Sequence, residues 1–175
     1  MAQLEYGYKT PGGVPGLIFD IAPYEINSLL IEEETEGKIK FGMGVVAGEV
    51  PGKTIKAVTA DTDIFEGVVV TNVHELDMKG RVVLDKGTSC SVMRYGRVWA
   101  RVDEEAEIKV NDKLYLITSG DKAGCVTNTS GLEIPGKFIG VAEDGIAPIV
   151  LADAAMAATS NTSAEEGLER EGGNE

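Results

Sequence analysis

The feature that most constrains the fold is the alternation of residues 91–102, "SVMRYGRVWARV". Successive side chains of a β-strand point to opposite faces, so residues of one parity share a face. Small and aliphatic residues dominate one parity here, and aromatic residues and arginines dominate the other. The first parity contains Val92, Arg94, Gly96, Val98, Ala100 and Val102, and the second contains Met93, Tyr95, Arg97, Trp99 and Arg101. The pattern predicts a strand, bent at Gly96, within a β-sheet.

Shorter strand-like runs surround this stretch between residues 39 and 151. They are "IKFGMGVVAG", "KTIKAVTA", "FEGVVVTN", "GRVVLDKG", "VNDKLYLIT", "AGCVTN", "GKFIGVA" and "GIAPIVLA". The chain has 22 glycines among its 175 residues, and many of them separate these runs. The "EDG" at 143–145 predicts a tight hairpin turn. Short strands repeated at about 8–12 residues predict an all-β fold, a small β-barrel or β-sandwich.

The two ends of the chain differ from this body. Residues 1–37 are expected to form an extended N-terminal arm, because "YGYKTPGGVPG" is dense in Gly and Pro and the following apolar run is interrupted by Pro23. Such a segment cannot form its own core, so it docks either on the body of the same chain or on a partner. Residues 38–152 are expected to form a β-rich domain. Residues 153–175 are small, polar and acidic, which predicts a weakly ordered tail with at most a short helix.

The charge of the chain limits the classes of partner. The formal net charge is −13 at pH 7, and the isoelectric point is about 4.5. Phosphate backbones and anionic lipid surfaces repel such a chain, so we expect neither a nucleic-acid nor a membrane partner. The start "MAQLEYGYKTPGG" lacks the basic and apolar regions of a secretion signal. We therefore expect a chain that is made in the cytoplasm and stays soluble.

The motifs of common enzymes and metal sites are incomplete in this sequence. Cys90 and Cys125 are isolated, and the single histidine, His74, has no second histidine at the zinc-protease spacing in "HELDM". The glycine-rich "GMGVVAG" lacks the Lys-Ser/Thr of a phosphate-binding loop. Buried, unreactive thiols in a reducing compartment are the expected state of the two cysteines. The sequence thus predicts no enzymatic activity, no metal and no cofactor.

A family resemblance adds to this interpretation. The stretch "CSVMRYGRVWARVDEEAEIKVNDKLYLI" resembles the structural cement, or capsid decoration, proteins of tailed bacteriophages. In these proteins a strand containing Gly, Val and Trp is followed by an acidic spacer and a second strand. "FGMGVV" at 41–46, "IFEGVVVTNVHE" at 64–75 and "GKFIGVAEDGIAPIVL" extend the resemblance over residues 38–151 in order. The Pro- and Gly-rich arm also resembles the starts of such proteins, whereas the acidic tail does not align.

The resemblance implies a non-enzymatic virion protein. Such a protein binds the outer surface of an assembled capsid and bridges neighbouring major capsid proteins, which stabilises the shell against the packaged DNA. It also implies a homo-oligomer, for which we prefer a trimer and allow a dimer. The alternatives are a small-molecule or carbohydrate-binding β module, and a hydrolase with paired carboxylates. The hydrolase is disfavoured because the acidic residues gather in turns and in the tail.

Two sets of residues are candidates for contacts. Large apolar residues of the arm are expected to bind the capsid, because buried aromatic side chains dominate interface energies. This capsid set is Tyr6, Tyr8, Leu17, Phe19, Ile21 and Tyr24. The second set, Arg94, Arg97 and Trp99, is expected at an oligomer interface. Ordinary core packing is a slightly favoured alternative for Trp99, and a solvated strand face is an equal alternative for the arginines.

Overall fold

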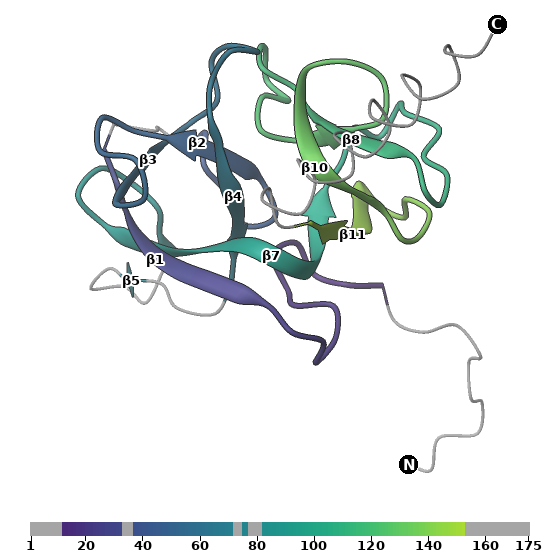
Figure 1. Ribbon diagram of the computed structural model, residues 1–175, viewed down its shortest axis with the longest axis horizontal. Coiled ribbons are helices and arrows are strands. Elements are labelled where there is room, and N and C mark those ends of the chain that lie inside the picture. The colour runs from purple at the N-terminus through teal and green to yellow at the C-terminus, as the bar shows by residue number, and fades with distance from the viewer. Residues whose placement is uncertain (1–11, 33–36, 72–74, 77–81, 153–175) are drawn as a thin grey trace, which may run out of the picture.

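The computed structural model describes residues 12–32, 37–71, 75–76 and 82–152 of the chain. These residues form strands and no helix, which confirms the all-β prediction (Figure 1). None of them forms a helix that could cross a membrane. The strands are β1 (Glu25–Ile31), β2 (Gly44–Ala47), β3 (Thr54–Lys56), β4 (Phe65–Val70), β5 (Glu75–Leu76), β6 (Val82–Val83), β7 (Ser89–Arg101), β8 (Lys113–Leu116), β9 (Val126–Thr127), β10 (Leu132–Phe138) and β11 (Ile146–Leu151).

Five strands close into a small barrel in the order β1-β3-β2-β4-β7. The barrel closes because β1 pairs with β7 as well as with β3. The β1–β3 pair is parallel, and the other pairs are antiparallel. Closure leaves no exposed sheet edge around the ring, which is how small β-proteins avoid unpaired strands. Of the two expected architectures, the barrel is the one that forms.

The strand β7 also belongs to a second sheet, ordered β7-β11-β10-β8-β9. The first half of β7 pairs with β4, as at Val92 and Val69, and the second half pairs with β11, as at Val98 and Ile149. A parallel bridge between Val102 and Val126 joins the region after β7 to the last strand of this sheet. Figure 1 shows the result, in which β7 crosses from the barrel lobe into the lobe of β8, β10 and β11.

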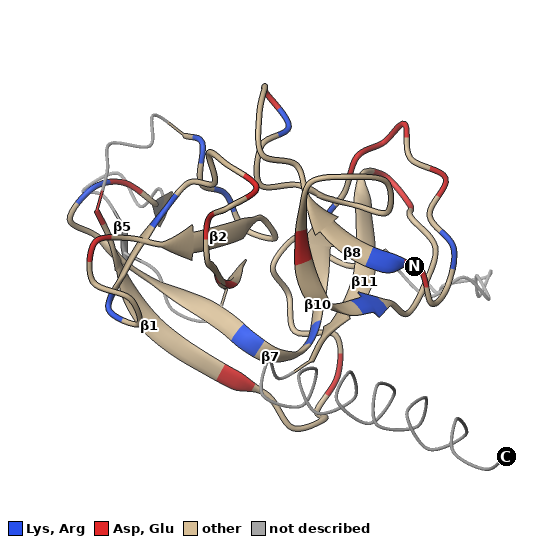
Figure 2. Ribbon diagram, turned by 45° about the horizontal axis from the view of Figure 1, so that its top comes forward, with Lys and Arg blue, Asp and Glu red and all other residues tan. Residues whose placement is uncertain are grey.

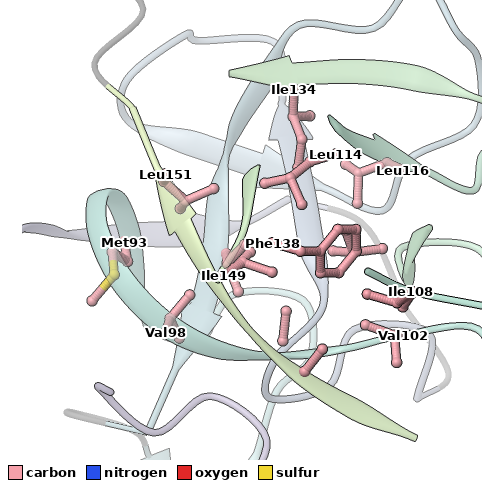
Figure 3. Close-up of a cluster of buried hydrophobic side chains, with 14 of the residues drawn as sticks. Met93, Val98, Val102, Ile108, Leu114, Leu116, Ile134, Phe138, Ile149 and Leu151 are labelled. Atoms are coloured by element: carbon pink, nitrogen blue, oxygen red, sulfur yellow. The ribbon is translucent and has the colours of Figure 1, made fainter. Parts of the chain in front are cut away.

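Two hydrophobic cores lie on either side of β4 and the first half of β7. The barrel core contains Leu29, Ile31, Ile39, Val45, Ile55, Val69, Cys90 and Val92. The second core includes Val68 and Val70 and surrounds Phe138, which lies among Leu114, Leu116 and Ile149 (Figure 3). Because neighbouring residues of β4 face different cores, Val68, Val69 and Val70 are all fully buried. The continuous apolar run "GVVV" therefore replaces the alternation of a one-sided strand.

The predicted strand at 91–102 is confirmed as β7, with one difference. Beyond Gly96 the alternation holds, because Val98 and Ala100 are buried whereas Arg97 is exposed. Over residues 90–93 both faces are buried, because this part of the strand lies between the two cores, whereas Arg94 and Tyr95 beside Gly96 are exposed. Gly96 has a φ angle of 126°, and a Cβ atom there would lie 2.6 Å from the Cβ of Tyr24. The strand thus exchanges its partners at its one glycine.

The segment that the sequence assigns to the arm is divided by the structure. Its residues 25–31 form β1 and complete the barrel, and Pro23 lies before this strand rather than inside it. We therefore use "arm segment" for residues 12–24 alone. The division of the chain into units ending at residues 37 and 152 stays a prediction, and residues 153–175 lie outside the described part of the chain.

Charged residues lie mainly on the loops that connect the strands (Figure 2). One such loop is the predicted hairpin turn, where Asp144 and Gly145 have φ angles of 51° and 73°. The amide of Glu143 donates to the carbonyl oxygen of Ile146 at 2.9 Å, and the amide of Ile146 donates back at 3.0 Å. Two left-handed residues between reciprocal bonds are typical of a two-residue hairpin loop, so this prediction is confirmed.

The two cysteines are buried and form no disulfide, as the sequence analysis expects. Burial disfavours the charged thiolate. It raises the pKa of the Cys90 thiol to about 11 and also raises the pKa of Cys125. At neutral pH both side chains are therefore protonated and behave as small apolar groups.

Candidate interaction surface

The arm segment pairs with the second half of β7, along the edge that β11 leaves free. The amide of Gly16 donates to the carbonyl oxygen of Trp99 at 2.7 Å. The amide of Trp99 donates to the carbonyl oxygen of Leu17 at 3.0 Å. The amide of Phe19 donates to the carbonyl oxygen of Arg97 at 2.9 Å. With an antiparallel bridge between Ile18 and Val98, residues 16–19 act as a short additional strand.

A crossing of two glycines fixes the start of this additional strand. Gly16 and Gly42 have φ angles of 80° and 79°, in the left-handed region that other residues rarely adopt. A Cβ atom on either glycine would lie 3.0 Å from the backbone nitrogen of the other. The carbonyl oxygen of Gly16 also accepts the amide of Thr71 at 2.9 Å. The arm segment is thus attached to the barrel as well as to β7.

The side chains of the arm segment alternate between the body and the solvent. Ile18 points inward and packs against the second core. Leu17, Phe19 and Ile21 point outward and are 46%, 40% and 101% exposed. Tyr24, at the end of the segment, is 50% exposed. Four of the six predicted capsid-contact residues therefore lie on the exposed face of one ordered segment, which we call the arm face: Leu17, Phe19, Ile21 and Tyr24.

Trp99 lies beneath the arm segment. Its ring and that of Phe19 are tilted by 49°, with 5.4 Å between their centroids, a favourable arrangement for two aromatic rings. The backbone of Gly13 covers the indole so closely that a Cβ atom on Gly13 would overlap its ring atoms. Trp99 is half-buried. Its surroundings match neither a buried core position nor a freely exposed one.

The two arginines of the predicted oligomer interface have acidic partners within the chain. Arg97 donates from Nη1 to Oδ2 of Asp20 at 2.6 Å, which ties the arm segment to β7. The amide of Ala22 and the Arg97 guanidinium lower the pKa of Asp20, against the opposing effect of burial. Arg94 lies 3.6 Å from the carboxylate of Glu66. A role of Arg94, Arg97 and Trp99 between subunits stays a prediction.

The last candidates are the two tyrosines at the start of the arm and the possible ligands of a metal ion. Tyr6, Tyr8 and His74 lie outside the described residues. Within the described ranges, no group of three or more His, Cys, Asp or Glu side chains is arranged to hold a metal ion. The absence of a metal or cofactor requirement stays a prediction.

The environment of Glu66 is not among the features that the sequence predicted. This residue is the only charged one in β4, and its side chain is 3% exposed. It lines a cavity with Arg94 and Tyr95 at the junction of the two sheets. The available signal was a single acidic residue before a glycine in an apolar run, a pattern typical of a β-bulge.

Comparisons with known proteins agree with the resemblance seen in the sequence. Residues 2–152 match the family described as structural cement protein (E217 gp24/Pam3 gp6). No curated protein matches the sequence. Among solved structures, a chain of "The capsid of Myoviridae Phage XM1" superposes with a TM-score of 0.63 at 13% identity, covering 83% of this chain and 94% of that one. This likeness shows a shared fold. Because the family match spans nearly the whole described body, the chain belongs to the structural cement proteins, which are non-enzymatic structural proteins of the bacteriophage capsid.

Proposed function

We propose that this virion protein binds the outer surface of the assembled capsid and bridges neighbouring major capsid proteins. In this role it stabilises the shell against the pressure of packaged DNA. The observation that carries the proposal is the arm face, in which Leu17, Phe19 and Ile21 stay exposed although the backbone of Leu17 and Phe19 is bonded to β7. Exposed apolar groups held together on an ordered segment are typical of a protein-binding surface.

The energetics favour such a contact. Burying one large aliphatic or aromatic side chain fully contributes about 1.5–3 kcal/mol, and these three begin 40–101% exposed. Because the backbone of the arm is already ordered, little conformational entropy is lost when it binds. A protein that binds only the assembled shell shifts the equilibrium toward assembly. Many copies on one capsid, each bridging two subunits, add to that effect.

We propose further that the protein acts as a homo-oligomer, with a trimer preferred and a dimer possible. An oligomer would engage several shell subunits at once, which raises avidity without stronger individual contacts. Arg94, Arg97 and Trp99 are our candidates for the subunit interface. Sedimentation velocity at micromolar concentration measures the oligomeric state, and a monomer both there and on capsids would overturn this part of the proposal.

Co-sedimentation with undecorated capsids tests the capsid-binding role. The test variant replaces Leu17, Phe19 and Ile21 together by Ser. The control replaces Val110 and Val141 by Ser, because these valines are also exposed, at 53% and 57%, but lie outside the arm. We expect the control to bind as the unmodified protein does and the arm-face variant to bind at least about tenfold more weakly. Saturation of capsids by the arm-face variant at the same concentration would remove the arm face from the proposal, and failure of the unmodified protein to bind would remove the role itself.

A further inference from the structure

Besides the arm face, the molecule has a cavity of about 330 Å³ that is lined in part by Glu66. Residues from four strands line it, so it lies where the barrel meets the second sheet. Glu25 comes from β1, Glu66 from β4, Arg94 and Tyr95 from β7, and Pro135 from β10. The cavity has about the size that one side chain or a small ligand requires.

Two β-bulges place the charged residues of this cavity. In the β2–β4 pair, Val45 lies opposite Gly67 and Val46 opposite Phe65, so Glu66 is an extra residue on its strand. In the β1–β7 pair, Glu25 lies opposite Tyr95 and Ile26 opposite Met93, so Arg94 is likewise an extra residue. A bulge turns a side chain away from its regular direction, and bulges are frequent next to functional sites. Adjacent strands thus each turn one charged residue toward the same cavity.

The carboxylate of Glu66 lacks a hydrogen-bond donor for one of its oxygens. The side chain is 3% exposed, and its Oε1 atom has no hydrogen-bond partner among the described residues. Nη2 of Arg94 lies 3.6 Å from this same oxygen, which is within the range of an ion pair but too long for a hydrogen bond, and the Arg94 side chain is 45% exposed. Buried polar atoms in proteins are nearly always satisfied by protein or by ordered water, so this oxygen requires a donor other than the described side chains, either a water molecule or a group of a bound partner.

The charges of the cavity select the kind of donor. Two carboxylates, Glu25 and Glu66, face one guanidinium, so an anion is excluded and a cation is favoured. The ring of Tyr95 and the apolar surfaces of Phe65 and Pro135 suit the alkyl part of a long basic side chain. We propose that the cavity binds the guanidinium or ammonium group of an arginine or lysine side chain on the capsid subunit. The identity of that partner rests on the proposed function, whereas the cation site rests on the cavity alone.

Nuclear magnetic resonance with small probes tests the cation site without a capsid. The probes are the N-acetyl amides of arginine and lysine, and the control is the N-acetyl amide of citrulline, which has the shape of arginine without its charge. We expect saturable shifts of the amides of Phe65, Glu66 and Tyr95 with at least one basic probe, at roughly millimolar affinity, and at least tenfold weaker binding of the citrulline probe. An absence of saturable shifts at these amides, or equal binding of the charged and neutral probes, would overturn the proposal.

A pair of variants then tests the assignment to Glu66 and to the capsid. Glu66→Gln keeps the shape of the side chain and removes its charge, and Glu133→Gln removes an exposed carboxylate that is paired with Lys113 at 3.0 Å. We expect Glu66→Gln to lose the shifts caused by the basic probes and to weaken capsid binding roughly tenfold, with Glu133→Gln unchanged in both. If the probes bind but Glu66→Gln binds capsids as tightly as the unmodified protein, the capsid subunit is not the source of the cation. The probe comparison uses the unmodified protein, so it decides the cation site even if Glu66→Gln fails to fold.

Discussion

Individual backbone positions determine where the arm segment lies. Gly16 and Gly42 approach each other where the arm crosses the barrel, and both have positive φ angles. Any side chain at Gly42 would contact Pro15, Gly16 and the amide of Arg101 at about 3 Å. Rigid backbone surrounds this position, so a side chain can be accommodated only if the arm moves away from β7.

Replacing Gly42 by Ala should therefore destabilise the protein more than replacing Gly52 by Ala. Gly52 has a similar φ angle of 75°, but nothing lies within 4 Å of the Cβ atom that would be added. Both variants incur the cost of a left-handed alanine, on the order of 1 kcal/mol, and only Gly42→Ala adds a steric conflict. We expect an additional loss of about 1–2 kcal/mol in the free energy of unfolding. Urea denaturation measures it, and equal losses in the two variants would show that the crossing tolerates a side chain.

Because the pKa of the buried Cys90 thiol is raised, we expect the folded protein to lose stability at alkaline pH. Its pKa is raised from 9.0 to about 11 in the folded protein, so the unfolded chain releases this proton at lower pH than the folded chain does. The stability that the neutral thiol provides is complete below pH 9 and is lost as the pH rises through 11. We expect a loss of about 2–3 kcal/mol over this window. From pH 8 to above pH 10, the free energy of unfolding should decrease more for the unmodified protein than for Cys90→Ala. Parallel pH profiles of the two proteins would contradict the assignment of this loss to Cys90.

Single residues also show how far the sequence could predict the site. Leu17, Phe19 and Ile21 are exposed, as expected for a Gly- and Pro-rich segment that cannot bury them on its own, and their role as contact residues stays a prediction. The partners of Arg97 and Arg94 could not be predicted. Asp20 is distant from Arg97 in the sequence, and Glu66 reaches Arg94 only because both strands are bulged.

At the scale of elements, β7 organises the molecule, and it was the best predicted strand. Its local pattern predicts a strand, since strand formation depends on side-chain alternation. The same pattern contains no information about its partners, which are β1, β4, β11 and the arm segment. The strand β1 was assigned to the arm because Pro23 and the short length of the run obscured its pattern. Pairing over long sequence distances decides such cases, and one sequence does not reveal it.

The pairing of the arm segment with β7 predicts joint protection from hydrogen exchange. The amides of Gly16, Phe19 and Trp99 all take part in the contact between these two segments. If the arm segment opens as one unit, these three amides should show the same free energy of opening to within about 0.5 kcal/mol. Exchange followed by nuclear magnetic resonance gives these values. Gly16 and Phe19 exchanging roughly a hundredfold faster than Trp99 would mean that the arm frays independently of β7.

At the scale of the whole molecule, two sheets that share one strand form a body that presents the arm face and the Glu66 cavity. The arm segment passes over Trp99 of β7, and Tyr24 packs at Gly96, where β7 exchanges its partners. Tyr95, which lines the cavity, is the neighbour of that glycine. A net charge of −13 favours a basic surface on the binding partner. We propose that the apolar arm face and the Glu66 cavity together form a two-part recognition surface for a shell subunit.

The most direct test of this account is a cryo-electron microscopy reconstruction of a capsid decorated with the protein. We expect the density for Leu17, Phe19 and Ile21 to be buried against the outer surface of the shell, with each copy or oligomer in contact with more than one major capsid protein. A reconstruction in which the arm face points into solvent, or in which each copy contacts a single capsid subunit, would contradict it.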